Sequence, residues 1–262
     1  MKHILVPIGS TETAQTTLQY AIDFAAAINA IVLVFRAYRA KAKAGSMVNV
    51  SAIIKRETNL YLRTMVNAVD RKNVDVKLIS SKGSVIESVD AIDKEIGIDL
   101  IIVGAKSNSF KEETFLGSTA GSLVKQTNIA VLTVPEKYVY KPVSNILMAF
   151  KSGIVKRANA IEPVQLFIQK FNPQVNLLLV KTPDFSEEDL VLSQGLLELQ
   201  SSFTTTENAT TFQGVLEHFQ THNPDMLCVF RRKRGFFKKL WEKNIILKKE
   251  FQTSIPLLIL KG

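Results

Sequence analysis

The sequence predicts an α/β fold of two tandem Rossmann-like domains, each a five-stranded parallel sheet with helices on both faces. Short apolar runs alternate with segments of helical periodicity along the first half of the chain. The same alternation begins again near residue 146. The apolar run that begins at Asp99 resembles the run that begins at Asp225, and the run at Asn128 resembles the run at Ser254. Both pairs of runs are separated by the same number of residues. A preserved offset across two strands favours a duplicated domain over chance.

The elements of the first half follow one another as strand and helix. Ile4–Ile8 is a short apolar run that ends before Gly9, which is typical of a buried strand in a parallel sheet. Apolar residues at helical spacing from Leu18 to Ile28 indicate the next helix, for which Ser10 and Thr11 are alternative caps. The remaining expected strands are Ile31–Phe35, Val74–Ile79, Asp99–Val103 and Ile129–Val134, and the remaining helices are 49–71, Val85–Ile96 and Gly117–Gln126.

Three of these segments carry a further signal. Residues 49–71 have the apolar spacing of a long amphipathic helix. Val74–Ile79 alternates apolar and polar residues, which places it nearer the sheet edge. Ser84 precedes the helix at 85–96 as a cap. Strands joined by helices in this order should be parallel and cross over right-handedly.

The second half repeats this order after a linker at residues 136–144. Ile146–Met148 corresponds to the first strand, and Leu177–Val180 corresponds to Ile31–Phe35. The last two strands are expected at Asp225–Val229 and Ser254–Ile259. We therefore expect a first domain at residues 1–138 and a second at residues 143–262.

The composition suits an intracellular globular protein. The chain has 262 residues, which favours two domains, and its 33 Lys and Arg against 24 Asp and Glu give a net charge of +9. The single cysteine, Cys228, allows no internal disulfide and suggests a reducing compartment. The apolar run at the N-terminus is too short for a signal peptide, and no apolar stretch is long enough to span a membrane. We expect a cytoplasmic protein.

A candidate phosphate loop follows the fourth strand. The strand ends at Gly104, a polar stretch follows, and Gly117-Ser118-Thr119 opens the next helix. Glycine lets a ligand approach the backbone closely, and a helix N-terminus offers free N–H groups to an anion. Ligands bind open α/β sheets at this edge. The alternative is that Gly117 only ends one element and that Ser118 only caps a helix.

In these residues the chain resembles the universal stress protein family. The family's nucleotide-binding members carry Gly, two residues, Gly, nine residues, and Gly-Ser or Gly-Thr. Gly104 and Gly117-Ser118 match this pattern, and Ser107 stands where the second glycine is expected. The resemblance extends over residues 1–135, and it reaches residues 143–262 only through strand order and the closing Ile255–Ile259.

The resemblance implies a stress-response or signalling module whose first domain binds ATP or a related nucleotide, with Mg²⁺ if ATP binds. Gly9 stands where the family has an aspartate for the ribose, and Arg36 stands where it has an apolar contact to adenine. Arg36 would either stack on the base or block it. The implied binding residues are Pro7, Ile8, Gly9, Arg36, Gly104, Ser107, Gly117, Ser118 and Thr119.

The second domain is degenerate by the same comparison, because no Gly-Ser turn follows Val229 and no acidic residue follows Met148 in the first-strand loop. In the family the fifth strands pair domains together. The expected partner of the first domain is therefore the second, through strands 129–134 and 255–260, while a homo-oligomer is the other arrangement that such strands allow.

A basic segment at residues 231–249 supplies most of the net charge. It holds nine Lys or Arg and one acid, Glu242, with Phe236, Phe237 and Trp241 interleaved. Such a segment can bind nucleic acid, an anionic membrane or an acidic protein. The alternative is that its charges are simply solvated. A non-nucleotide interaction protein that uses this segment is thus the second functional hypothesis.

No catalytic constellation is present. The sequence lacks the P-loop signature and the Gly-x-Ser-x-Gly elbow, and no nucleophile, base and orienting group stand together. His218 and His222 have metal-ligand spacing but no evident third ligand. We expect no metal site, no catalytic residue and, at most, slow ATP hydrolysis.

Overall fold

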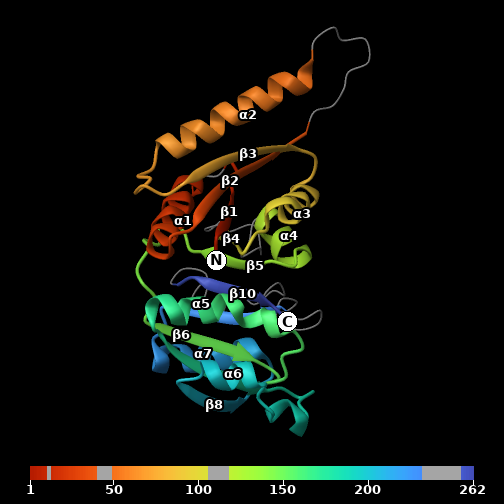
Figure 1. Cartoon of the computed structure of the whole chain (residues 1–262). Coiled ribbons are helices and arrows are strands. Elements are labelled where there is room, and N and C mark those ends of the chain that lie inside the picture. The colour runs from red at the N-terminus through yellow and green to blue at the C-terminus, as the bar shows by residue number, and fades with distance from the viewer. Residues whose placement is uncertain (11–12, 40–48, 106–117, 232–254) are drawn as a thin grey trace. The chain divides into compact units, whose positions relative to one another are not determined.

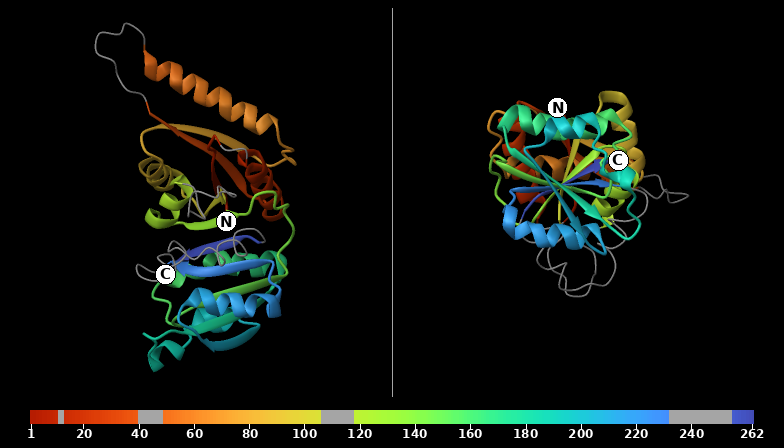
Figure 2. Two further views of the ribbon diagram at one scale, coloured as in Figure 1. Left: turned by 180° about the vertical axis from the view of Figure 1, so that it is seen from behind. Right: turned by 90° about the horizontal axis from the view of Figure 1, so that it is seen from below.

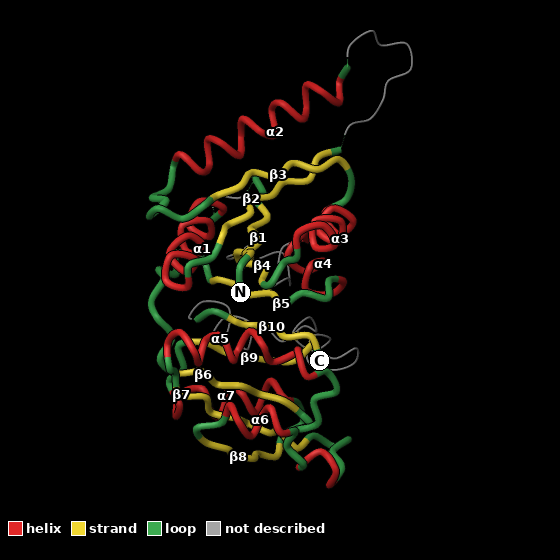
Figure 3. The backbone as a smooth tube through the Cα atoms, in the orientation of Figure 1, coloured by secondary structure: helices red, strands yellow, loops and turns green. Residues whose placement is uncertain are grey.

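Strands alternate with helices along the whole chain, so the α/β class is confirmed (Figures 1 and 3). The structure, a computed structural model, describes residues 1–10, 13–39, 49–105, 118–231 and 255–262. The described residues fall into two compact units. The first unit holds Met1–Gly104, 118–129 and Glu136–Tyr140, and the second holds Ala105, Ala130–Pro135 and Lys141–Gly262 without its undescribed segment.

The first unit contains four parallel strands in the order β3-β2-β1-β4. The strands are β1 (His3–Pro7), β2 (Ile31–Tyr38), β3 (Val76–Lys82) and β4 (Leu100–Gly104). The helices are α1 (Ala14–Ile28), α2 (Val50–Asn67), α3 (Val85–Ile96) and α4 (Ser118–Gln126). β3 lies at the edge of this sheet, as its alternating pattern predicted, and α1 and α3 lie on opposite faces (Figure 1).

Local sequence signals account for most of these helix boundaries. The Ser84 hydroxyl accepts a hydrogen bond from the Glu87 N–H, and the Glu87 carboxylate accepts one from the Ser84 N–H, so the Ser84 cap that the sequence predicts is part of a full capping box. The cap predicted for α1 differs. Thr13 occupies the N-cap position without a side-chain cap bond, while the Ser10 hydroxyl accepts a hydrogen bond from Arg36 instead.

Helix α1 packs very closely on the end of β4. A Cβ atom built on Gly104 would lie 2.5 Å from the Thr17 hydroxyl oxygen and 3.4 Å from that of Thr13. The first distance is shorter than real Cβ contacts allow. Gly104 therefore has a packing role, because an added Cβ would force the Thr17 side chain, or α1 with it, to shift.

The second unit contains parallel strands in the order β10-β9-β6-β7-β8, with β5 added antiparallel to β10. The strands are β5 (Ala130–Val134), β6 (Asn145–Phe150), β7 (Gln174–Lys181), β8 (Ser202–Glu207), β9 (Met226–Arg231) and β10 (Leu257–Lys261). The helical segments are η1 (Ala158–Ile161), α5 (Glu162–Phe171), η2 (Glu187–Leu190), α6 (Gln194–Leu199) and α7 (Thr211–His222). Figure 2 shows α5 and α7 on opposite faces of this sheet.

Specific contacts explain why the unit boundary does not follow the sequence order. β5 belongs to the second unit because its residues pair with β10, Leu132 with Leu258 and Thr133 with Leu257. The segment after it returns to the first unit, where the rings of Tyr138 and Tyr140 lie 6.1 and 5.6 Å from that of Tyr20 on α1. Aromatic packing thus anchors the predicted linker on α1.

Within the described residues, no helix combines the length and apolar character that a membrane crossing requires.

We predict that Cys228 is chemically inert in the folded chain. Its side chain is fully buried in β9, and this burial raises the pKa of the thiol, whereas the thiolate is the reactive form. A chromogenic disulfide reagent at pH 8 should therefore titrate no thiol in native protein and one thiol per chain in guanidinium chloride. Rapid reaction of the native protein would contradict the burial of β9.

Gly104→Ala should lower the free energy of unfolding by about 1–3 kcal/mol, because the added methyl group overpacks the contact with Thr17. Denaturant unfolding followed by circular dichroism measures this change. In a Thr17→Ala background, which removes the hydroxyl, the same substitution should cost much less. Equal costs in both backgrounds would show that the contact with Thr17 does not matter.

Candidate functional site

The carboxyl ends of β1, β2 and β4 form one edge of the first unit's sheet. β1 lies between the other two strands, Pro7 pairs with Phe35, and the Ile8 N–H donates to the Phe35 carbonyl at 2.7 Å. Gly9 and Ser10 then leave the sheet, and β4 ends beside them at Gly104. The structure thus brings Pro7, Ile8, Gly9, Arg36 and Gly104 to a single edge, where open α/β sheets bind ligands.

Arg36 connects the strand ends to α2. Its Nη2 donates to the Ser10 hydroxyl at 3.0 Å, and its guanidinium carbon lies 4.2 Å from the centroid of the Tyr61 ring. The Tyr61 hydroxyl in turn donates to the Gly9 carbonyl at 2.9 Å. We call Gly9, Ser10, Arg36 and Tyr61 the Arg36 cluster. One face of the planar guanidinium thus lies on the Tyr61 ring.

One nitrogen of Arg36 lacks a partner. Nη1 is buried, and no residue in the described ranges accepts a hydrogen bond from it. A buried charged donor without an acceptor is unfavourable by about 1–3 kcal/mol or more. An oxygen atom from a ligand would remove that penalty, and a phosphate oxygen would do so with a charge-assisted bond.

Gly9 contributes its backbone alone to this edge. The aspartate that the family places here for the ribose is replaced by a residue without a side chain, and the Gly9 carbonyl already accepts from Tyr61. The cluster therefore offers a cation and an aromatic ring, while position 9 offers no carboxylate. These groups suit a phosphate better than a ribose.

Some predicted site residues contribute less to this geometry. Ser107 and Gly117 lie outside the described residues. Ser118 is the first residue of α4, and Thr119 beside it is exposed. Because α4 follows β4, its N-terminus belongs to the same edge of a right-handed parallel arrangement.

The sequence did not indicate Tyr61 as a site residue, and it suggested only a helix-capping role for Ser10. Nothing in the helical pattern of residues 49–71 distinguishes Tyr61 from its neighbours. The one available signal was Arg36 itself, because a cation at the end of an apolar strand requires a partner.

The basic segment is described only at its first residue. Arg231 ends β9, and burial lowers the pKa of its guanidinium. Lys261 is its register partner on β10, and the pKa of Lys261 is lowered first by burial and then by the charges of Arg157 and Arg231. Residues 232–249, which carry the other charges, lie outside the described ranges.

The two histidines with metal-ligand spacing, His218 and His222, interact with each other within α7. His222 Nδ1 lies 3.0 Å from the His218 carbonyl oxygen, so one ring nitrogen already has a partner in α7. Among the described residues, no three His, Cys, Asp or Glu side chains gather as a metal site would require.

Two solved structures that match nearly the whole chain support the fold. A universal stress protein from Archaeoglobus fulgidus DSM 4304 matches over 99% of this chain and 98% of its own, with 13% sequence identity and a TM-score of 0.74. A functionally unknown protein from Pseudomonas aeruginosa PAO1 matches over 100% and 93%, with 13% identity and a TM-score of 0.59. A universal stress protein in complex with cAMP matches over 52% and 98%, with 18% identity and a TM-score of 0.42.

The sequence comparisons concern the first half of the chain. No curated protein sequence matches the chain. The sequence model of the universal stress protein family matches residues 1–135, which include the Arg36 cluster and all four strands of the first unit's sheet. The chain therefore belongs to the universal stress protein family.

Proposed function

We propose that this chain is a cytoplasmic stress-response or signalling module whose first unit binds ATP or a related nucleotide, recognised mainly through its phosphates. The observation that carries the proposal is the buried, unpartnered Nη1 of Arg36 at the carboxyl edge of the sheet. A phosphate oxygen supplies the missing acceptor.

The remaining groups at this edge support the same ligand. α4 begins at Ser118, so the positive end of its dipole and its free N–H groups favour a negative charge there. A nucleobase beside Arg36 is compatible with this edge, since arginine stacks on flat rings. Recognition of the ribose would be weak, because Gly9 has no carboxylate.

The second half of the chain would serve the first as a built-in partner. Its strand order β10-β9-β6-β7-β8 contains the pattern of β4-β1-β2-β3 in the first unit, which supports a duplicated pair of domains at residues 1–138 and 143–262. The antiparallel pairing of β5 with β10 supports an interaction between fifth strands. Nucleotide binding at the Arg36 cluster would then alter a surface that a signalling partner reads.

Titration calorimetry of the full chain tests the ligand. ATP with Mg²⁺ should bind at one site per chain, and adenosine should bind far more weakly. Arg36→Met should weaken ATP binding about tenfold or more, because a charge-assisted hydrogen bond contributes about 1.5–3 kcal/mol. Arg63→Met is the matched control, because it removes the same charge from an exposed position on α2.

Two results would contradict the proposal. If adenosine binds as tightly as ATP, or if Arg36→Met binds like Arg63→Met, the phosphates are not recognised by Arg36. If no nucleotide binds, Gly9 and Ser107 mark a lost site, and the basic segment at 231–249 becomes the surface to examine with anionic vesicles and nucleic acid.

A further inference from the structure

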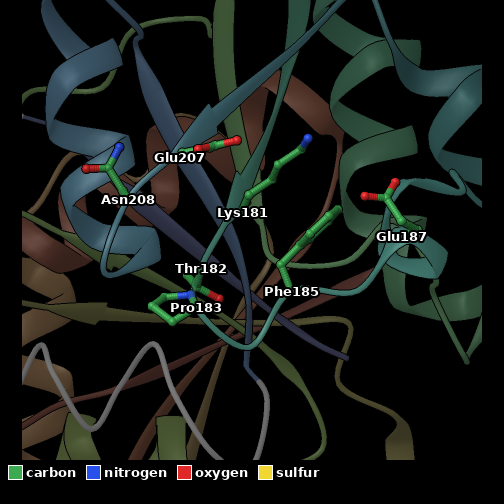
Figure 4. A pocket seen from close by; sticks show the side chains of 7 residues that line it. All are labelled: Lys181, Thr182, Pro183, Phe185, Glu187, Glu207 and Asn208. Atoms are coloured by element: carbon green, nitrogen blue, oxygen red, sulfur yellow. The ribbon is translucent and has the colours of Figure 1, made fainter.

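The second unit has a cavity of its own at the carboxyl ends of β7 and β8. Its volume is about 430 Å³, and it is lined by the ends of both strands and by the turn that follows β7 (Figure 4). Small-molecule sites commonly have volumes of about 300–1,000 Å³ and occur at this edge of parallel sheets. The cavity lies entirely within the second unit and involves none of the Arg36 cluster.

The walls of this cavity are held by their own hydrogen bonds. Asp184 accepts a hydrogen bond from the Thr182 hydroxyl and pairs with Lys151 at 2.9 Å, and these two contacts lower the pKa of its carboxyl to about 2. The Asn208 N–H donates to the Lys181 carbonyl at 3.0 Å, and its Nδ2 donates to Glu217 at 2.9 Å. The frame is thus formed before any ligand arrives.

The charged side chains that line the cavity, in contrast to Asp184, form no ion pairs within the described residues. The Lys181 ammonium lies 5.2 Å from the centroid of the Phe185 ring. Lys181 and Glu207 are the last register partners of β7 and β8, and Glu187 is the first residue of η2. Figure 4 shows Lys181 between the side chains of Glu207 and Glu187. Within the described residues, no ion pair joins these three side chains to a partner.

We infer that this cavity binds a free amino acid with a basic side chain. The Lys181 ammonium thus has one carboxylate on either side, that of Glu207 and that of Glu187. Together these three groups give the site a net negative charge. A basic amino acid carries the complementary charges, two cations and one carboxylate, with the α-ammonium and the carboxylate on the same carbon and the side-chain cation several bonds away. Its carboxylate would meet Lys181, and its two cations would meet Glu207 and Glu187.

The aromatic ring favours a cation at the Glu187 end. Phe185 lies beside Glu187 in Figure 4, and a ring face attracts a cation within about 6 Å of its centroid. Lys181 holds that place in the unbound chain. When the ligand carboxylate draws the Lys181 ammonium toward itself, the ligand's side-chain cation takes the position over the ring.

Titration calorimetry with the full chain tests this inference. L-lysine and L-arginine should bind, whereas L-norleucine, which lacks the side-chain cation, and 1,5-diaminopentane, which is lysine without its carboxylate, should bind at least tenfold more weakly. Glu207→Gln and Glu187→Gln should each weaken L-lysine binding about tenfold. Glu188→Gln, next to Glu187 and outside the lining, is the control and should leave the affinity unchanged.

The outcomes separate this site from the nucleotide site. Arg36→Met should keep full L-lysine binding, and Glu207→Gln should keep full ATP binding. Equal binding of norleucine or diaminopentane, no binding of L-lysine up to about ten millimolar, or an equal effect of Glu187→Gln and Glu188→Gln would each overturn the inference. Because Glu187 and Glu207 are exposed, both variants should fold, which unchanged thermal unfolding would verify.

Discussion

The constraint on which the rest of this structure depends is the burial of the central strands on both faces. In β1 the residues Ile4, Leu5 and Val6 are completely buried, and in β6 the run from Ile146 to Phe150 is buried throughout. A strand covered by helices on two sides has no position along its length where a charge would be solvated. Polar chemistry can therefore be placed only where the strands end.

The two units use that edge differently. In the first unit, Arg36 near the end of β2 lies against Tyr61, so the edge presents a cation whose Nη1 is buried and lacks an acceptor within the described residues. In the second unit, β7 ends at Lys181, but Glu207 on the adjacent β8 and Glu187 in the following turn outweigh its charge. The same architecture thus presents a site suited to anions in one half and a site with net negative charge in the other.

The sequence predicted the parts of the fold that depend on local and periodic signals. The helix at Val85–Ile96 agrees with α3 residue for residue, and the predicted cap Ser84 marks its start, where the structure adds Glu87 to complete a capping box. The start of α1 could not be predicted in the same way, because Ser10 bonds to Arg36, a residue distant in sequence, and not to the helix. Tyr61 and the cavity near Lys181 were missed for the same reason, since both arise from contacts between elements far apart in the chain.

Gly104 illustrates how one residue can carry two explanations that the sequence cannot separate. A glycine at the end of a parallel strand indicates a ligand that approaches the backbone, and the family pattern reinforces that interpretation. The structure adds that the Thr17 side chain fills the space beyond its Cα, so packing against α1 is a second reason for glycine here. A glycine that packing favours is retained even in a chain that no longer binds the ligand. Arg36, whose buried Nη1 has no acceptor among the described residues, is therefore the better indicator of what this edge binds.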